Sequence, residues 1–208
     1  MIVLADNDVL LKLAQCDLFE EFLTAFQVTA AEVAITRRTR FSIKVPRHRK
    51  KLGQENFGRL EAFLEKISDV HDEPTPSAIA FLTDQIGIDA GEAVLFAICT
   101  QRENCIIATG DKQCLLGLRE AATTDQDCEA ICQTLSGKIF CFEQIIHRIL
   151  GHFGFETVRE KLIRGRECDA GLRLWLGSTL DANEDRFREG LTSHLDDLRR
   201  NTGNLLAP

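Results

Sequence analysis

The sequence contains no apolar run long enough to cross a bilayer, no internal repeat and no low-complexity tract. It also has no basic leader, because the short apolar run at residues 2–5 is followed at once by Asp6. These absences argue against a membrane, fibrous or secreted protein, so we expect a cytoplasmic one with no membrane partner. The 208 residues, 44% hydrophobic and 27% charged, suit one globular domain with an appendage.

The eight cysteines lack the pattern of a disulfide framework. Several lie inside apolar runs, as Cys99 and Cys141 do, which predicts reduced thiols packed in a core. Cys128 and Cys132 are one helical turn apart but have no second pair of ligands. Core packing is therefore the better interpretation of this pair than a structural zinc site.

Short apolar runs alternate with helical patterns along the first two thirds of the chain. We predict strands at residues 2–5, 26–28, 105–109 and 138–142, with helices between them. This alternation predicts an α/β fold, a Rossmann-like three-layer α/β/α arrangement with a mostly parallel sheet.

From Glu143 onward only helical spacing remains, which predicts a core domain at 1–142 and a helical C-terminal extension at 143–208. Its last amphipathic segment, 183–200, has three open interpretations: packing on its own domain, dimerisation, or binding of a partner.

Acidic residues stand at the ends of predicted strands and the starts of predicted helices, where ligands bind in parallel α/β sheets. The residues concerned are Asp6, Glu32, Asp89, Glu92 and Asp111. Carboxylates brought together raise one another's pKa, and such a cluster usually persists around a compensating cation. Mg²⁺ and Mn²⁺ prefer oxygen ligands and activate water against phosphate esters. Taken singly, each acid is also explained as a helix cap or a surface residue.

The net charge of -7 disfavours a polyanionic partner, yet basic residues are concentrated between positions 37 and 51 without an acid among them. We predict that this basic block contacts the backbone of a nucleic acid, with a solvated surface as the alternative. The block consists of Arg37, Arg38, Arg40, Lys44, Arg47, Arg49, Lys50 and Lys51.

Four stretches, residues 2–13, 28–32, 89–93 and 106–111, together resemble PIN-domain nucleases, including the toxin ribonucleases of bacterial toxin-antitoxin pairs. The resemblance covers about residues 1–145. It implies a PIN-like fold, a site for Mg²⁺ or Mn²⁺, and hydrolysis of phosphodiester bonds in RNA or, as a second choice, DNA. A toxin role would add an antitoxin or other protein partner, and we expect a homodimer.

Carried over by position, the resemblance implies catalytic roles for Asp6, Glu32, Glu92 and Asp111, with Asp89 as an alternative to Glu92 as metal ligand. It also implies that Thr109, two residues before Asp111, orients a carboxylate or water. The sequence departs from the family directly after the first aspartate. The family usually has a small hydroxyl residue and then Asn there, whereas this chain has Asn7 and Asp8. The C-terminal helices are likewise not explained by the family.

Two alternatives to a nuclease remain open. Asp6 and Asp8 also fit the Asp-x-Asp motif of haloacid-dehalogenase-like phosphatases, but the later acidic motif of that family is missing, since Leu115 stands where its second acid belongs. A catalytically silent nucleic-acid-binding or protein-binding module, with structural carboxylates, is the third interpretation.

Overall fold

A single parallel sheet forms the centre of the molecule in the computed structural model, which describes residues 1–70, 79–85, 88–177 and 182–208. Within these residues five strands pair in the order β3-β2-β1-β4-β5, and all neighbouring strands are parallel. The strands are β1 (Ile2–Ala5), β2 (Val33–Ile35), β3 (Ser68–Asp69), β4 (Cys105–Thr109) and β5 (Ile139–Cys141). The predicted mixed α/β class with a parallel sheet is confirmed.

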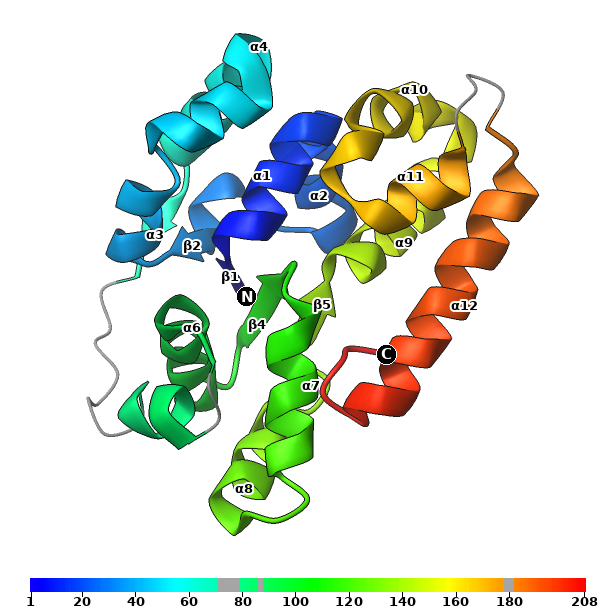
Figure 1. The fold of residues 1–208 in the computed structure, drawn as a ribbon. Helices are drawn as coiled ribbons and strands as arrows, with labels where there is room; N and C mark the ends of the chain where they lie inside the picture. The colour runs from blue at the N-terminus through cyan, green and yellow to red at the C-terminus, as the bar shows by residue number, and fades with distance from the viewer. Residues whose placement is uncertain (71–78, 86–87, 178–181) are drawn as a thin grey trace.

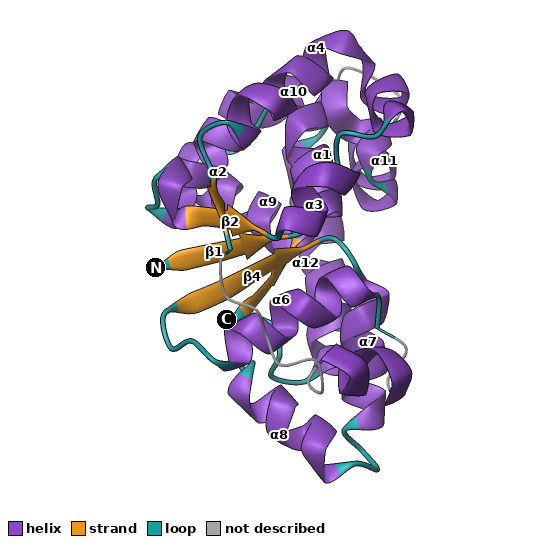
Figure 2. Ribbon diagram, turned by 90° about the vertical axis from the view of Figure 1, so that its left-hand side faces the viewer, coloured by secondary structure: helices purple, strands orange, loops and turns teal. Residues whose placement is uncertain are grey.

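Helices cover both faces of the sheet, which is compatible with a three-layer arrangement (Figure 2). The helices on one face are α1 (Asn7–Cys16), α2 (Phe19–Phe26) and α9 (Phe142–Phe153). The helices on the other face are α6 (Ala90–Thr100), α7 (Lys112–Ala121) and α8 (Gln126–Thr134). The chain between β2 and β3 forms α3 (Arg37–Ser42) and α4 (Pro46–Leu64), and the C-terminal part forms α10 (Phe155–Gly165), α11 (Ala170–Leu176) and α12 (Glu184–Thr202). Short turns of helix are η1 (Ala30–Glu32), η2 (Phe81–Gln85) and η3 (Arg166–Cys168).

The second strand lies elsewhere than predicted. The strand predicted at residues 26–28 is wrong, because Phe26 ends α2 and Gln27 has the left-handed conformation that closes a helix. In place of the helix predicted directly after that strand, Ala30–Glu32 form only the single turn η1. The apolar run Val33–Ile35 that follows is fully buried and pairs with β1, so burial on the sheet decides its conformation.

The helices after residue 142 pack on the sheet domain through one continuous hydrophobic cluster, which includes Phe142, Phe155 and Phe187. The apolar face of α12 is buried within the same chain. Near the C-terminus, Leu206 forms a parallel bridge with Ile139 at the edge of β5. The amphipathic segment at 183–200 therefore uses its apolar face inside its own chain. None of the helices in the described part of the chain is both long and apolar enough to cross a membrane.

All eight cysteines are free thiols, and all but the partly exposed Cys168 are buried, which confirms the prediction of reduced core residues.

Candidate functional site

The strand order creates a crevice at the carboxyl edge of the sheet. From β1 the chain passes to β2 on one side, whereas β4 pairs with β1 on the other, so the connections after β1 and β4 diverge. Figure 1 shows α1 and α3 on one side of this edge, and α6 and α7 on the other. A cavity of about 570 Å³ opens there, which we call the acid pocket. Its lining residues are Asp6, Asn7, Asp8, Thr39, Asp89, Gly91, Glu92, Leu95, Gly110, Asp111, Lys112 and Gln113.

Asp6 follows β1 directly and is buried at the floor of the pocket. It caps α1, because its Oδ1 accepts a hydrogen bond from the Val9 backbone N–H at 2.7 Å. Its Oδ2 accepts from the Thr109 hydroxyl at 2.6 Å and the Gly110 N–H at 2.9 Å. Burial raises the pKa of Asp6 to about 6, although these hydrogen bonds oppose the shift. Oδ1 keeps one acceptor site for a further ligand.

Glu92, in the first turn of α6, has the most strongly perturbed carboxyl group in the pocket. Burial, reinforced by repulsion from Asp111, Asp6 and Asp89, raises its pKa to about 8. Its Oε2 atom is buried and has no hydrogen-bond partner. A buried carboxylate oxygen without a donor is costly, so a cation at this position would be favourable.

Asp111 and Asp89 cap the two helices that flank the pocket. Oδ1 of Asp111 accepts from the backbone of Gln113 at 2.8 Å, and Oδ1 of Asp89 accepts from Gly91 at 2.7 Å. Both acids thus have a structural role, as their sequence context predicted, and both also line the acid pocket. One carboxylate oxygen in each is left without a cap bond, so capping and cation binding are compatible.

Cys114 is a neighbour of the acids that sequence inspection missed. One ligand atom each from Glu92, Asp111 and Cys114 lie within 4.8 Å of one another. The helical spacing of 111 and 114 is the one local signal for this contact, and a buried cysteine in an apolar setting favours core packing instead. Burial and repulsion from Glu92 and Asp111 raise the pKa of the Cys114 thiol well above its ordinary range. The thiol therefore stays protonated, and the oxygens make up a donor set that suits a hard cation.

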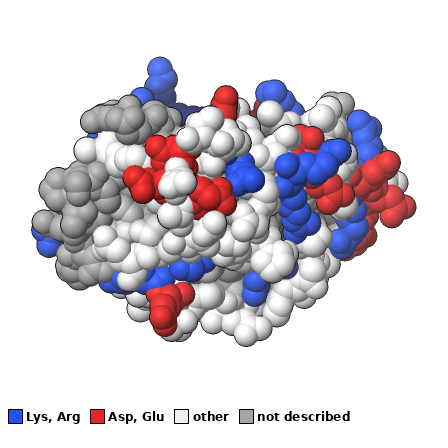
Figure 3. Space-filling model, turned by 90° about the horizontal axis from the view of Figure 1, so that it is seen from below, with Lys and Arg blue, Asp and Glu red and all other residues white. Residues whose placement is uncertain are grey.

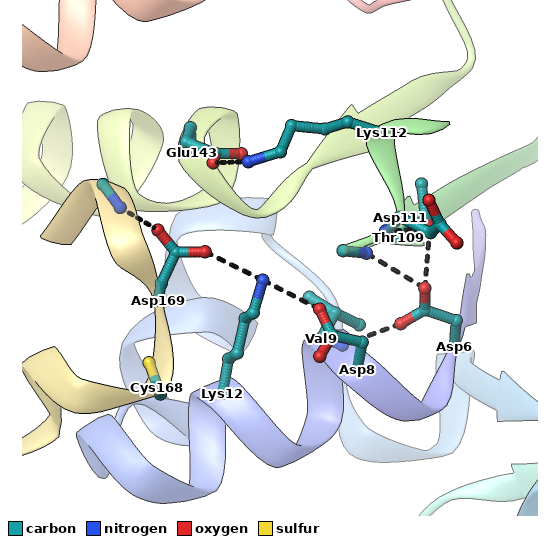
Figure 4. Close-up of polar contacts among 12 residues, drawn as sticks. Asp6, Asp8, Val9, Lys12, Thr109, Asp111, Lys112, Glu143, Cys168 and Asp169 are labelled. Carbon is teal, nitrogen blue, oxygen red and sulfur yellow. Dashed lines mark hydrogen bonds and ion pairs between the residues drawn. The ribbon is translucent and has the colours of Figure 1, made fainter. Parts of the chain in front are cut away.

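Asp8 connects the acid pocket to the C-terminal helices (Figure 4). The buried ammonium of Lys12 lies 2.8 Å from Oδ2 of Asp8 and 2.9 Å from Oδ2 of Asp169, the N-cap of α11. Although burial lowers the pKa of Lys12, the two carboxylates outweigh burial and raise it above its ordinary range. Asp8 also packs so closely on Gly110 that a Cβ at that position would be 1.9 Å from its Oδ2. Any larger residue there would have to displace the Asp8 side chain.

A second ion pair joins the pocket to α9 and α12. Lys112, which lines the pocket, donates to the buried Glu143 at 2.5 Å (Figure 4). His194 Nε2 lies 3.5 Å from the same Oε1 atom. Burial alone would raise the pKa of Glu143, but His194 and Lys112 outweigh it and lower the pKa to about 2. Both lysines beside the acid pocket are therefore neutralised by carboxylates from the C-terminal helices.

Glu32 does not belong to this site, because the structure does not bring it together with the other predicted acids. It precedes β2, whereas Asp6 follows the adjacent parallel strand β1, so the two lie at opposite edges of the sheet. Its carboxylate accepts from the Thr29 backbone N–H at 2.9 Å in a capping box and lies 3.3 Å from the Met1 ammonium. The misplaced strand at 26–28 caused the error, because it put Glu32 after a strand instead of before one.

The basic block is spread over α3, the turn that carries Lys44, and α4, and its members have different surroundings. Arg40 is used internally, since it donates to Asp69 at 2.5 Å and to two backbone carbonyls. Arg49 lies over the Phe57 ring, with the guanidinium carbon 4.9 Å from its centroid. The other six members are exposed: Arg37, Arg38, Lys44, Arg47, Lys50 and Lys51. Figure 3, a view from the side of α8, shows charges of the two signs gathered in groups on another part of the surface.

Comparisons of the chain with models of protein families, with curated proteins and with solved structures give no match. The acid pocket itself therefore carries the functional inference below.

Proposed function

We propose that this protein is a divalent-metal-dependent nuclease with a PIN-like fold, which hydrolyses phosphodiester bonds in RNA with Mg²⁺ or Mn²⁺. The observation that carries the proposal is the buried, unpartnered Oε2 of Glu92 beside Asp111 and Asp89. A divalent cation would remove both the repulsion among these carboxylates and the lack of a partner for this oxygen.

The residues of the pocket fit such an ion. Glu92 and Asp111, whose ligand atoms lie within 4.8 Å of each other, would hold it, and Asp6 and Asp89 line the same pocket and add negative charge around it. Mg²⁺ binds proteins through few carboxylates and keeps several waters, for which a cavity of about 570 Å³ has room. When bound, such a cation activates water and stabilises charge on the phosphate. Thr109 fixes Asp6 by donating to its Oδ2, in line with the orienting role expected from the sequence.

The partners proposed with this activity are RNA and, if the enzyme is of the toxin type, an antitoxin protein. A homodimer is part of the same proposal. The PIN resemblance supports these partners, and the strand order with its crevice between β1 and β4 is compatible with that resemblance.

The test is a cleavage assay with single-stranded and structured RNA and single-stranded DNA, titrated with Mn²⁺ and Mg²⁺. The informative variant is Asp111→Asn, because an amide oxygen retains the helix cap while the charge is lost. We expect it to lose at least a hundredfold in rate, since it removes a ligand of the ion. Asp125→Asn is the matched control, because Asp125 caps α8 in the same way and does not line the pocket.

Asp6→Asn is a poorer test, since both oxygens of Asp6 accept buried hydrogen bonds and an amide nitrogen would face a donor. If wild-type protein bound these nucleic acids but cut none of them with either metal, the nuclease proposal would be wrong and a silent binding module would be favoured.

A further inference from the structure

Phe41 is an aromatic side chain that the fold leaves in water. Its side chain on α3 is 78% exposed, and the other large hydrophobic residues described as exposed are Met1 and Leu174. A phenyl ring offers a flat apolar face that gains free energy when it is covered. Among the described residues most large apolar side chains are buried, so the ring on α3 is an available apolar surface for a flat partner.

The neighbours of Phe41 indicate the chemistry of that partner. Arg37 lies one helical turn before Phe41 on the same face of α3, next to Arg38, and Lys44 follows three residues after Phe41 in the turn beyond the helix. All three cations are exposed, and they form no ion pair within the described residues. An aromatic ring framed by unpaired cations is complementary to a base flanked by phosphates.

The position of α3 relates this surface to the acid pocket. Thr39 of α3 lines the pocket, and the Asn7 side-chain amide, also in its lining, donates to the Ser42 hydroxyl at 2.8 Å. Arg40 holds the helix from its other side through Asp69. The helix is therefore anchored at the rim of the pocket, with its basic and aromatic face directed to solvent.

We propose that Phe41 stacks on a base of single-stranded nucleic acid, while Arg37, Arg38 and Lys44 contact the phosphates on either side. This inference rests on the proposed function, since it concerns the strand that enters the acid pocket. Bases in a duplex already stack on one another and do not present a free face, whereas those of a single strand do. Phe41 thus gives the protein a preference for unpaired segments.

The test measures binding without metal, so that it does not depend on cleavage. Fluorescence anisotropy in EDTA compares a labelled single-stranded RNA with a duplex of the same sequence, for wild type and Phe41→Ala. We expect the variant to bind the single strand about tenfold more weakly, as loss of one stacked base predicts, and the duplex almost unchanged. Leu174→Ala is the matched control, since Leu174 is 67% exposed on α11. This substitution should change the affinity for neither the single strand nor the duplex.

Two further measurements separate stacking from charge. Phe41→Trp should keep the affinity, and its indole fluorescence should be quenched when the single strand binds. The slope of log Kd against log salt should stay the same in Phe41→Ala but fall in a variant with Arg37→Gln and Lys44→Gln.

Equal affinity of Phe41→Ala and wild type for the single strand would overturn the proposal, as would an equal loss for duplex and single strand. Unchanged RNA binding with loss of self-association in Phe41→Ala would overturn it too, and would assign the ring to a contact between copies of this chain. A cleavage assay that failed while these binding results held would reject the nuclease activity and leave the stacking surface standing.

Discussion

Replacing Glu92 by Gln should stabilise the metal-free protein at alkaline pH. The pKa of Glu92 in the folded protein is about 8, against an ordinary value of 4.5. Between these values the unfolded chain has released a proton that the folded protein still holds, so rising pH favours unfolding. Above pH 8 the folded protein carries the whole cost of the buried charge. Glutamine carries no charge and avoids that cost at every pH.

The magnitude follows from the same two pKa values. The folded pKa lies about 3.5 pH units above the ordinary one, and each unit corresponds to about 1.4 kcal/mol, which sets an upper bound of about 5 kcal/mol. Glu92 is only partly buried, so solvent screens part of this cost and we expect about 2 kcal/mol. The difference between variant and wild type should vanish as the pH falls to about 4.5.

The assay is urea unfolding in EDTA and reductant at pH 5, 7 and 9, with Glu120→Gln, an exposed acid on α7, as control. Added Mn²⁺ should make the wild type more stable to unfolding than Glu92→Gln at pH 8. An ion at 100 times its Kd stabilises the folded wild type by about 2.7 kcal/mol, whereas it binds the variant weakly. A Glu92→Gln variant no more stable than wild type at pH 9 without metal would refute the reasoning, since it would mean that the carboxylate is not under strain.

Two other substitutions test the supports of the pocket. Lys12→Met should cost about 3 kcal/mol in urea unfolding, because it leaves the carboxylates of Asp8 and Asp169 without their shared cation; a cost below 1 kcal/mol would mean that water replaces the ammonium. Gly110→Ala should displace Asp8 and weaken Mn²⁺ binding, measured by calorimetry, at least tenfold. Gly58→Ala is its control: a Cβ there has no neighbour within 4 Å, so the helix should gain about 0.5–1 kcal/mol and Mn²⁺ affinity should stay the same.

The strands β1, β4 and β5 and most of the acids were predictable because their signals are local. The strands at residues 2–5 and 105–109 are short apolar runs, and each is followed within two residues by an aspartate that caps the next helix. Asp89 three residues before Glu92 likewise marks a helix start, as the structure has it. The residues that end a strand and cap the next helix are close neighbours in the sequence, so a local pattern predicts them.

The misplacement of Glu32 also came from a short segment of the sequence. Residues 26–35 contain two apolar runs, and periodicity over so short a stretch does not distinguish a helix end from a strand. Assigning the strand to the first run moved Glu32 from one edge of the sheet to the other. Pairing with β1 decides between the runs, and that is a contact between segments about thirty residues apart.

By itself, then, the sequence determined the α/β class, the reduced cysteines and the acids that follow β1 and β4, all of which depend on neighbours along the chain. The tertiary structure alone decided the partners of Lys12 and Lys112, since Asp169 is 157 residues from Lys12 and Glu143 is 31 residues from Lys112. It alone also decided that the Arg40 side chain holds α3 in place, whereas the side chain of the neighbouring Phe41 is exposed to water. Which side chains meet depends on how distant segments pack, and no pattern within one segment encodes that choice.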